Sequence, residues 1–455
     1  MSHLPFGQTL PDVRVPPPGP ESLRLAVELA RYESPNVTYL APDFPVFWAE
    51  AKGANVHDVD GNSYVDLTAA FAVAGAGHAH PRIVEAIHAQ AGRLLHGMGD
   101  VHPPDVKVAL LREIAGVAPG ELCQSILTNS GAEAIEAALK TAALATGKPG
   151  VLAFAGGYHG LTYGALTVQT RVDFRGPFVR QLRENAVFAP YPYPYRSAEH
   201  HEDPAGCAAA SLAEVERLLD GERGAEIGAI LVEPVQARGG DLVPHESFLP
   251  ALRRICDERR LLLILDEIYT GFGRTGRWFA CEHTGTVPDL MAVGKGLTGG
   301  LPFAACIGTE LAMSAWPRST GEAIHTSTFL GHPLGCAAAL ASIATLREER
   351  LVERSASLGA SLKARLQAMT ASHPRVGEVR GQGMMIGIEM VRDRGTREPA
   401  PELVGRVVVE ALRGGVLVLG GGIYGNVLSL SPPFVITDAQ ADAALAVLEE
   451  ILQKM

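Results

Sequence analysis

The strongest constraint on the fold is a run of apolar residues that ends in two carboxylates. Residues 261–265 read LLLIL, and Asp266 and Glu267 follow directly. A continuous apolar run of this length predicts a strand that is buried on both faces, as in parallel sheets. Asp266 would then lie at the carboxyl end of that strand, which is the edge where open α/β sheets bind ligands.

A lysine in a glycine frame follows this strand, within the sequence VGKGL at residues 293–297. A carboxylate and an amine beside apolar sequence are costly unless something uses them. Pyridoxal phosphate (PLP) requires this pair, because a lysine amine forms its Schiff base and an acid keeps its ring nitrogen protonated. Lys295 and Asp266 are therefore the predicted catalytic residues. Alone, an Asp-Glu pair after a strand is more often a helix cap or a surface turn, and a lone Gly-Lys-Gly is more often a solvated loop, so the prediction depends on further motifs.

The composition restricts the class of protein. The chain has 455 residues, 47% hydrophobic and 20% charged, as in ordinary globular enzymes. A net charge of −11 without a basic block argues against nucleic acid as a partner. No apolar segment is long enough for a membrane span and no signal pattern is visible, so we expect a cytoplasmic protein. The six cysteines lack CxxC spacing, so neither disulfides nor a metal site are predicted.

Strands and helices alternate from about residue 105 to 330, which predicts an α/β fold with a mostly parallel sheet and helices on both faces. The expected strands are 125–128, 151–154, 227–232, 261–265 and 304–308. The segment 191–206 is rich in proline and polar residues, so we expect a long loop near the active site or an interface. The sequence GFGRTG at 271–276 matches a dinucleotide fingerprint only formally and is interpreted as a turn.

The chain ends are predicted to form a smaller α+β domain. A hairpin is expected within 56–67, two long helices within 334–371, a strand at 384–391, a helix at 401–414, and strands near 415–418 and 427–430. Thr437 and Gln440 form a capping box for the last helix. The predicted division is an N-terminal arm at 1–20, the first part of the small domain at 21–65, a large PLP-binding domain at 66–332, and the rest of the small domain at 333–455.

Further motifs supply the other parts of a PLP site. Ser130, Gly131 and Ala132 begin a helix after strand 125–128, where open N–H groups can bind a phosphate, and Ser130 with Glu133 makes a capping box. A plain capped helix is the alternative for this motif. In a loop that bears glycine, Thr328 offers a hydroxyl suited to a phosphate oxygen.

The ring of the cofactor would lie between two side chains. Tyr158, flanked by glycines and followed by His159, can lie flat on a planar ring, although packing in the core explains it equally well. Ile268 would pack on the opposite face of the ring. Glu233 and Gln236, which follow strand 227–232, would face the cleft.

In this order the motifs resemble the class III PLP-dependent aminotransferases, which have fold type I. The resemblance runs from about residue 37 to 452 through NSGAE (129–133), YHG (158–160), EPVQ (233–236), DEI (266–268) with GFGRTG, and GK (294–295). It also includes DVDGN (58–62), GHAHP (77–81), and TF (328–329) with PLG (333–335). The resemblance implies a homodimer with active sites at the subunit interface, where Thr328 reaches the phosphate of the neighbouring subunit's cofactor.

The sequence is similar to the branch of 4-aminobutyrate aminotransferases and amino-acid racemases, but it departs from that branch at the substrate. The two arginines that hold carboxylates in the aminobutyrate enzymes are matched here by Leu161 and Ser429. Without these bidentate contacts the binding free energy of a substrate carboxylate would be weaker by several kcal/mol, which is the order of magnitude of charge-assisted hydrogen bonds. This argues against 4-aminobutyrate as the natural substrate.

Arg238 stands where the family usually has an acidic residue that pairs with the second of those arginines. We expect Arg238 to bind a substrate carboxylate from the opposite wall, with a solvent-facing side chain as the alternative. Phe71 and Leu161 would form an apolar wall. Because arginine is a poor base, the sequence favours transfer of an amino group from an amino acid or amine to a 2-oxo acid. A racemase or epimerase on the same fold is the alternative.

Overall fold

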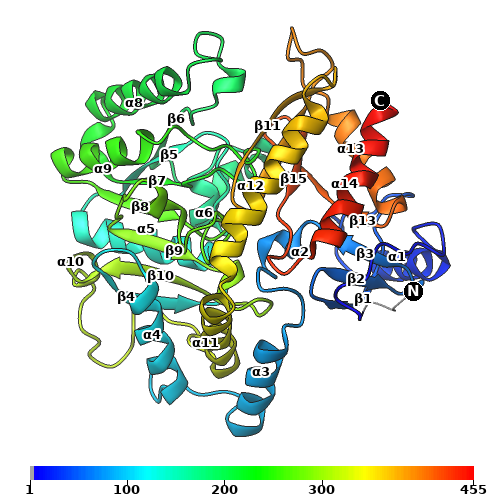
Figure 1. Ribbon diagram of the computed structural model, residues 1–455. Helices are drawn as coiled ribbons and strands as arrows, with labels where there is room; N and C mark the ends of the chain where they lie inside the picture. Colours follow the sequence, from blue (N-terminus) through cyan, green and yellow to red (C-terminus); the bar gives the residue numbers. More distant parts are fainter. Residues whose placement is uncertain (1–4) are drawn as a thin grey trace.

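A mixed sheet with strand order β4-β10-β9-β8-β7-β5-β6 is the central layer of the computed structural model, which describes residues 5–455 (Figure 1). Strands β5 to β9 are mutually parallel, whereas β10 is antiparallel to both β9 and β4. The predicted, mostly parallel sheet is confirmed. The strands are β4 Leu122–Thr128, β5 Gly150–Phe154, β6 Ala186–Ala189, β7 Ile227–Val232, β8 Leu262–Asp266, β9 Leu290–Val293 and β10 Ala304–Thr309.

Both faces of the sheet are covered by helices. In β7, Ala229 and Leu231 join one core cluster with residues of α5, whereas Ile230 and Val232 join another with residues of α9. Alternate residues of a strand point to opposite faces, so an apolar residue is needed at every position. The helices of this part are α3 Pro81–Arg93, α4 Asp105–Val117, α5 Gly131–Thr146, α6 Tyr163–Thr167, α7 Val172–Arg175, α8 Pro204–Asp220, α9 Phe248–Arg259 and α10 Glu310–Met313.

Two smaller sheets lie beside the central one, on the side where both chain ends are found (Figure 1). The first has the order β1-β2-β3-β13, and it contains the predicted hairpin as β2 and β3. Because β13 pairs in parallel with β3, the beginning and the end of the chain share one sheet. The second has the order β11-β12-β15-β14. The strands are β1 Trp48–Lys52, β2 Asn55–Asp58, β3 Ser63–Asp66, β11 Val376–Gln382, β12 Met385–Met390, β13 Val416–Leu417, β14 Leu419–Gly421 and β15 Val427–Leu430.

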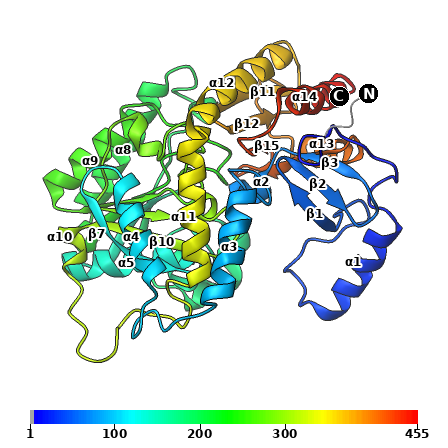
Figure 2. The same ribbon diagram turned by 60° about the horizontal axis from the view of Figure 1, so that its bottom comes forward.

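The two predicted long helices are α11 Pro333–Glu348 and α12 Leu351–Thr370, separated at Arg350, whose φ of 54° cannot continue a right-handed helix. Figure 2 shows α11 beside α3, against which it packs. The remaining helices are α1 Pro20–Tyr32, α2 Ala69–Ala72, α13 Pro401–Arg413 and α14 Asp438–Gln453. The capping box of Thr437 and Gln440 at the start of α14 is confirmed. Among residues 5–455, none of these helices has the length and apolar character of a membrane span.

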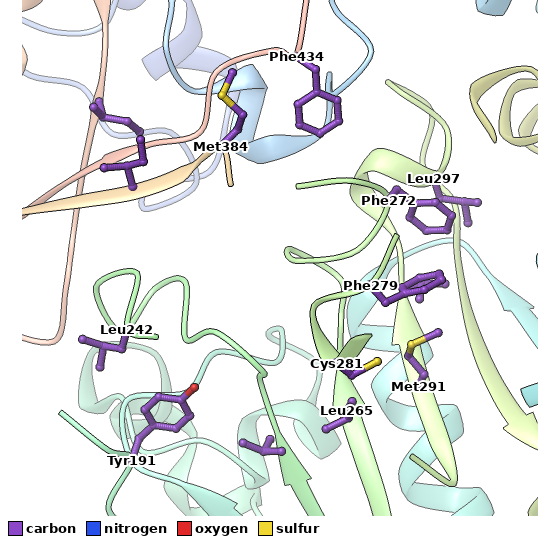
Figure 3. Packing of buried hydrophobic residues seen from close by; sticks show 14 of the residues in the cluster. Tyr191, Leu242, Leu265, Phe272, Phe279, Cys281, Met291, Leu297, Met384 and Phe434 are labelled. Atoms are coloured by element: carbon purple, nitrogen blue, oxygen red, sulfur yellow. The ribbon is translucent and has the colours of Figure 1, made fainter. Parts of the chain in front are cut away.

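A buried arginine joins the central sheet to the C-terminal part. Arg274 is 1% exposed, and its Nη1 donates to the carbonyl oxygens of Met384 at 3.0 Å and Pro432 at 2.7 Å. Its guanidinium carbon lies 4.6 Å from the ring centroid of Phe434. Met384 and Phe434 belong to the same core cluster as Phe272, which lies beside Arg274 in the chain (Figure 3). The sequence GFGRTG therefore forms a turn, as predicted, and its arginine contacts the C-terminal part of the chain.

We expect Arg274→Ala to lower the free energy of unfolding by about 3 kcal/mol, because two buried carbonyl oxygens lose their donor and a cavity forms beside Phe434. Urea denaturation measures this change. Arg277→Ala is the matched control, since Arg277 is exposed on the same turn and surface substitutions change stability by less than about 0.5 kcal/mol. Equal effects of both variants would contradict the structural role of Arg274.

Candidate active site

Most of the predicted site residues meet at one edge of the central sheet. Strands β4, β5, β7, β8 and β9 all end at this edge, because β10 is antiparallel to both of its neighbours. A cavity of about 510 Å³ opens there. It is lined by the predicted residues Phe71, Ser130, Gly131, Ala132, Tyr158, His159, Leu161, Glu233, Arg238, Asp266, Ile268 and Lys295, and also by Gly160, Ala237 and Tyr269.

Asp266 and His159 form a buried pair at the end of β8. The Nδ1 atom of His159 lies 2.7 Å from Oδ2 of Asp266, and the two side chains are 2% and 4% exposed. Burial alone would lower the pKa of His159, but its hydrogen bond to Asp266 and the charge of that carboxylate together raise the pKa above its usual value. The other oxygen of Asp266 accepts a hydrogen bond from the backbone N–H of Ile268 at 3.1 Å. The Asp266 carboxylate is therefore fixed by two hydrogen bonds where it lines the cavity.

Lys295 follows β9 and presents its amine to the same cavity. Burial lowers the pKa of Lys295 below its usual value; the carboxylates of Asp266 and Glu233 oppose this change, and the charge of Arg238 adds to it. The Nζ atom lies 4.7 Å from the ring centroid of Tyr269. The φ of Lys295 is 43°, a left-handed conformation that is strained for a residue with a side chain. Lys295 is therefore a buried amine on a strained backbone at the wall of the cavity.

Glu233 connects the loops that carry Tyr158 and Arg238. One of its carboxylate oxygens accepts from the backbone N–H of Tyr158 at 2.8 Å, and the other accepts from that of Ala237 at 3.1 Å. Burial raises the pKa of Glu233 to about 7; the charge of His159 opposes this rise and that of Asp266 adds to it. These hydrogen bonds hold two cavity walls in one arrangement.

The first turn of α5 lines the cavity beside Ile268. A Cβ atom added to Gly131 would lie 2.9 Å from Cδ1 of Ile268, so only glycine fits there without displacing that side chain. The hydroxyl of Ser130 accepts from the N–H of Glu133 at 3.3 Å. The predicted capping box is nevertheless wrong in its second half, because the Glu133 carboxylate accepts from the N–H of Asn129 at 2.8 Å and no bond from Ser130 N–H closes the box.

The outer wall of the cavity contains an unusual backbone segment. Residues 69–72 all have φ between 43° and 64°, and they present Phe71 to the cavity. Left-handed residues with a Cβ cost roughly 1–2 kcal/mol each. Thr68 supports the segment, since its hydroxyl accepts from the N–H of Ala70 at 3.1 Å. Phe71 is 55% exposed and Leu161 is 51% exposed, so the wall is apolar and open.

Three predicted site residues do not line the cavity. Gln236 is buried, and its Nε2 donates to the carbonyl oxygen of Ala155 at 2.9 Å. Thr328 is exposed in the irregular segment before α11. Ser429 lies in β15, where it pairs with Gly387 of β12. Their roles in binding stay predictions.

Sequence reasoning overlooked two residues near the site. Tyr269 could have been found, because it lies within the sequence that follows β8. Asp241 carried no recognisable pattern, yet it is fully buried and neither of its carboxylate oxygens has a hydrogen-bond partner among residues 5–455. Burial raises the pKa of Asp241 to about 7, although the nearby Ser429 hydroxyl and Arg380 guanidinium lower it in part.

Comparison with known proteins agrees with this geometry. The family model described as Aminotransferase class-III matches residues 39–452. A 4-aminobutyrate aminotransferase of Mycobacterium leprae (strain TN) is 37% identical over 441 residues, which are 96% of each chain. A 5-aminovalerate aminotransferase of Pseudomonas aeruginosa is 37% identical over 90% of this chain and 94% of its own. An amine transaminase from an uncultivated Pseudomonas species, solved in a PLP-bound form, superimposes with a TM-score of 0.86 at 30% identity, over 93% of this chain and 98% of its own.

We expect Asp241→Asn to stabilise the protein at high pH. The pKa of Asp241 is raised from 3.8 to about 7 in the folded protein, so its ionisation removes stability as the pH rises through that interval, by up to about 4 kcal/mol. Asparagine does not ionise and tolerates the φ of 53° at this position. The gain in free energy of unfolding is therefore larger at pH 8 than at pH 5, by roughly 3 kcal/mol.

Urea denaturation of both proteins at the two pH values measures this difference. The control is Asp442→Asn, whose carboxylate is 63% exposed and whose effect is expected to be the same at both pH values. A gain for Asp241→Asn that does not depend on pH would contradict the burial of an unpaired carboxylate.

Proposed function

Since this chain belongs to the class III aminotransferases, we propose that it transfers an amino group between an amino donor and a 2-oxo acid at the cavity around Lys295, with PLP as its cofactor. The observation that carries this proposal is the convergence of the Lys295 amine and the buried Asp266–His159 pair on one cavity. The relatives named above are aminotransferases, which favours transamination over the racemase alternative.

The residues of the cavity fit PLP. When bound, PLP supplies the electron-withdrawing ring that stabilises negative charge on the substrate carbon. Asp266 would hold the proton on the ring nitrogen, and the hydrogen bond to His159 would fix the position of that carboxylate. The side chains of Tyr158 and Ile268 would pack on the two ring faces. The N–H groups at the start of α5, with Gly131 leaving space in front of Ile268, would bind the phosphate.

Lys295 would have two tasks. Its amine would hold the cofactor covalently. When free, the amine would carry a proton to or from the α-carbon of the substrate. A lysine with an ordinary pKa is protonated at neutral pH and therefore a poor base. The lowered pKa of Lys295, caused first by burial, supports this second task.

Thr328 belongs in this proposal as a residue that acts across a homodimer interface. It is exposed and lies outside the cavity of its own chain. In the same segment Ile324 is 67% exposed and Phe329 is 55% exposed, and large apolar side chains of this kind are typical of surfaces that bind another chain. Thr328 would contribute a hydroxyl to the phosphate site of the neighbouring subunit.

We expect Lys295→Ala to lower transamination by at least about 10³-fold, because both the anchor and the proton carrier are lost. Borohydride reduction followed by mass spectrometry tests the anchor independently of turnover: the wild-type chain gains the mass of the reduced cofactor, and the variant does not. Lys454→Ala, which removes an exposed lysine near the C-terminus, serves as control for both measurements. Covalent labelling of the Lys295→Ala chain would refute the assignment.

We expect a mixture of two inactive or impaired variants to regain activity. Thr328→Ala should lower the affinity for PLP by about 10-fold, as loss of a hydrogen bond to a charged group does. If Thr328 acts across the interface, a dimer of one Lys295→Ala subunit and one Thr328→Ala subunit contains one complete site. Co-refolded mixtures assayed at limiting PLP therefore exceed the activity of either variant alone. Activity no higher than that of Thr328→Ala would show that the hydroxyl acts within its own chain or not at all.

A further inference from the structure

Arg238 is a cation in the cavity wall without a carboxylate partner. Three other ionisable side chains of the cavity have partners, because His159 is bound to Asp266 and Glu233 accepts from two backbone N–H groups. Among the ion pairs and side-chain hydrogen bonds of residues 5–455, none involves the Arg238 guanidinium, whose contacts are instead with two aromatic rings. A half-buried guanidinium in this state is available to an anion that enters the cavity.

Two aromatic rings hold the Arg238 side chain in place. Its guanidinium carbon lies 5.1 Å from the ring centroid of Tyr158 and 5.9 Å from that of Phe174. The two rings pack edge to face with centroids 5.7 Å apart. Contact with ring faces fixes a guanidinium without using its N–H donors. The side chain is thus oriented while all of its donors stay free for a ligand.

Arg171 supports the same arrangement from behind. It precedes α7, and its guanidinium carbon lies 5.2 Å from the ring centroid of Phe174. Its Nη1 donates to the backbone oxygen of Arg238 at 3.4 Å, and the N–H of Gly422 donates to the same oxygen at 3.2 Å. The carboxylate of Asp173, 3.7 Å away, is 81% exposed and therefore offsets little of the charge of Arg171.

The positive charge extends toward the reacting amine. The pKa of Arg171 is lowered by burial first and then by the charge of Arg238. The same charge of Arg238 contributes to the lowered pKa of Lys295. A substrate carboxylate that enters the cavity is therefore attracted to the wall that carries Arg238.

We propose that Arg238 is the carboxylate-binding residue of this enzyme, with Tyr158 and Phe174 as its support and Arg171 as a positioning residue. The substrate class is amino acids and oxo acids, as opposed to amines that lack a carboxylate. This inference rests on the proposed aminotransferase function and adds the group that selects its substrates.

Three donors test the proposal on the PLP-loaded protein. Norvaline and 5-aminopentanoate both become butan-1-amine when their carboxylate is removed, so the three differ in the presence and place of that group. We expect Arg238→Met to lower kcat/KM for at least one of the two amino acids by roughly 10- to 100-fold, the effect of a lost hydrogen-bonded charge pair. The value for butan-1-amine stays within about twofold, because methionine preserves the apolar contact with the rings.

Binding of an inert carboxylate gives a readout that does not require turnover. Calorimetry with valerate, and with pentan-1-ol as its uncharged counterpart, should show a Kd for valerate raised about 10-fold or more in Arg238→Met, and no change for the alcohol. Arg238→Lys retains the charge but lacks the planar guanidinium that can bind a carboxylate through two N–H groups. Its Kd for valerate is expected to lie between those of wild type and Arg238→Met. Arg183→Met removes an exposed arginine and should leave both constants unchanged.

Arg171→Met tests positioning separately. We expect KM for the amino acid to rise about three- to tenfold while kcat for butan-1-amine is unchanged, because only carboxylate contacts depend on the place of Arg238. In Arg238→Met, an equal loss of kcat/KM on all three donors would overturn the inference while the aminotransferase function stands. Unchanged binding of valerate in that variant would do the same. Failure of the wild-type protein to convert any donor while it binds valerate through Arg238 would instead remove the proposed function.

Discussion

The contact between buried Asp266 and His159 is the interaction on which the charge arrangement of the cavity depends. The imidazole lies 2.7 Å from the buried carboxylate, which raises the pKa of His159. The charge of Asp266 also raises the pKa of Glu233 and opposes the lowering of the pKa of Lys295. One carboxylate at a strand end thus influences three ionisable groups of the cavity.

The fold and the cavity floor could be predicted because they follow from local rules. An apolar run buried on both faces indicates a parallel strand, and parallel strands end at one edge. Residues that directly follow β4, β5, β7, β8 and β9 therefore meet, whatever the details of the helices. The two central strands that were not predicted, β6 and β9, each have four residues. Runs this short are difficult to separate from the ends of helices or from loops.

Other features could not be predicted because they depend on contacts between distant segments. Gln236 follows the same strand as Glu233, but its side chain binds the backbone of Ala155, and no sequence pattern specifies that choice. The Glu133 carboxylate had two backbone N–H groups within reach and binds that of Asn129. Asp241 is buried only because β12 and β15 of the small sheet pack over it, beside Gly387 and Ser429.

The left-handed backbone at residues 69–72 restricts how the cavity can be altered. Glycine and asparagine adopt such a conformation readily, whereas valine and isoleucine do so at a high steric cost. Diversification of position 71 in the laboratory would therefore be expected to eliminate β-branched side chains, even where such a group would fill the opening well. The range of shapes accessible to this wall is set by its main chain before any ligand is considered.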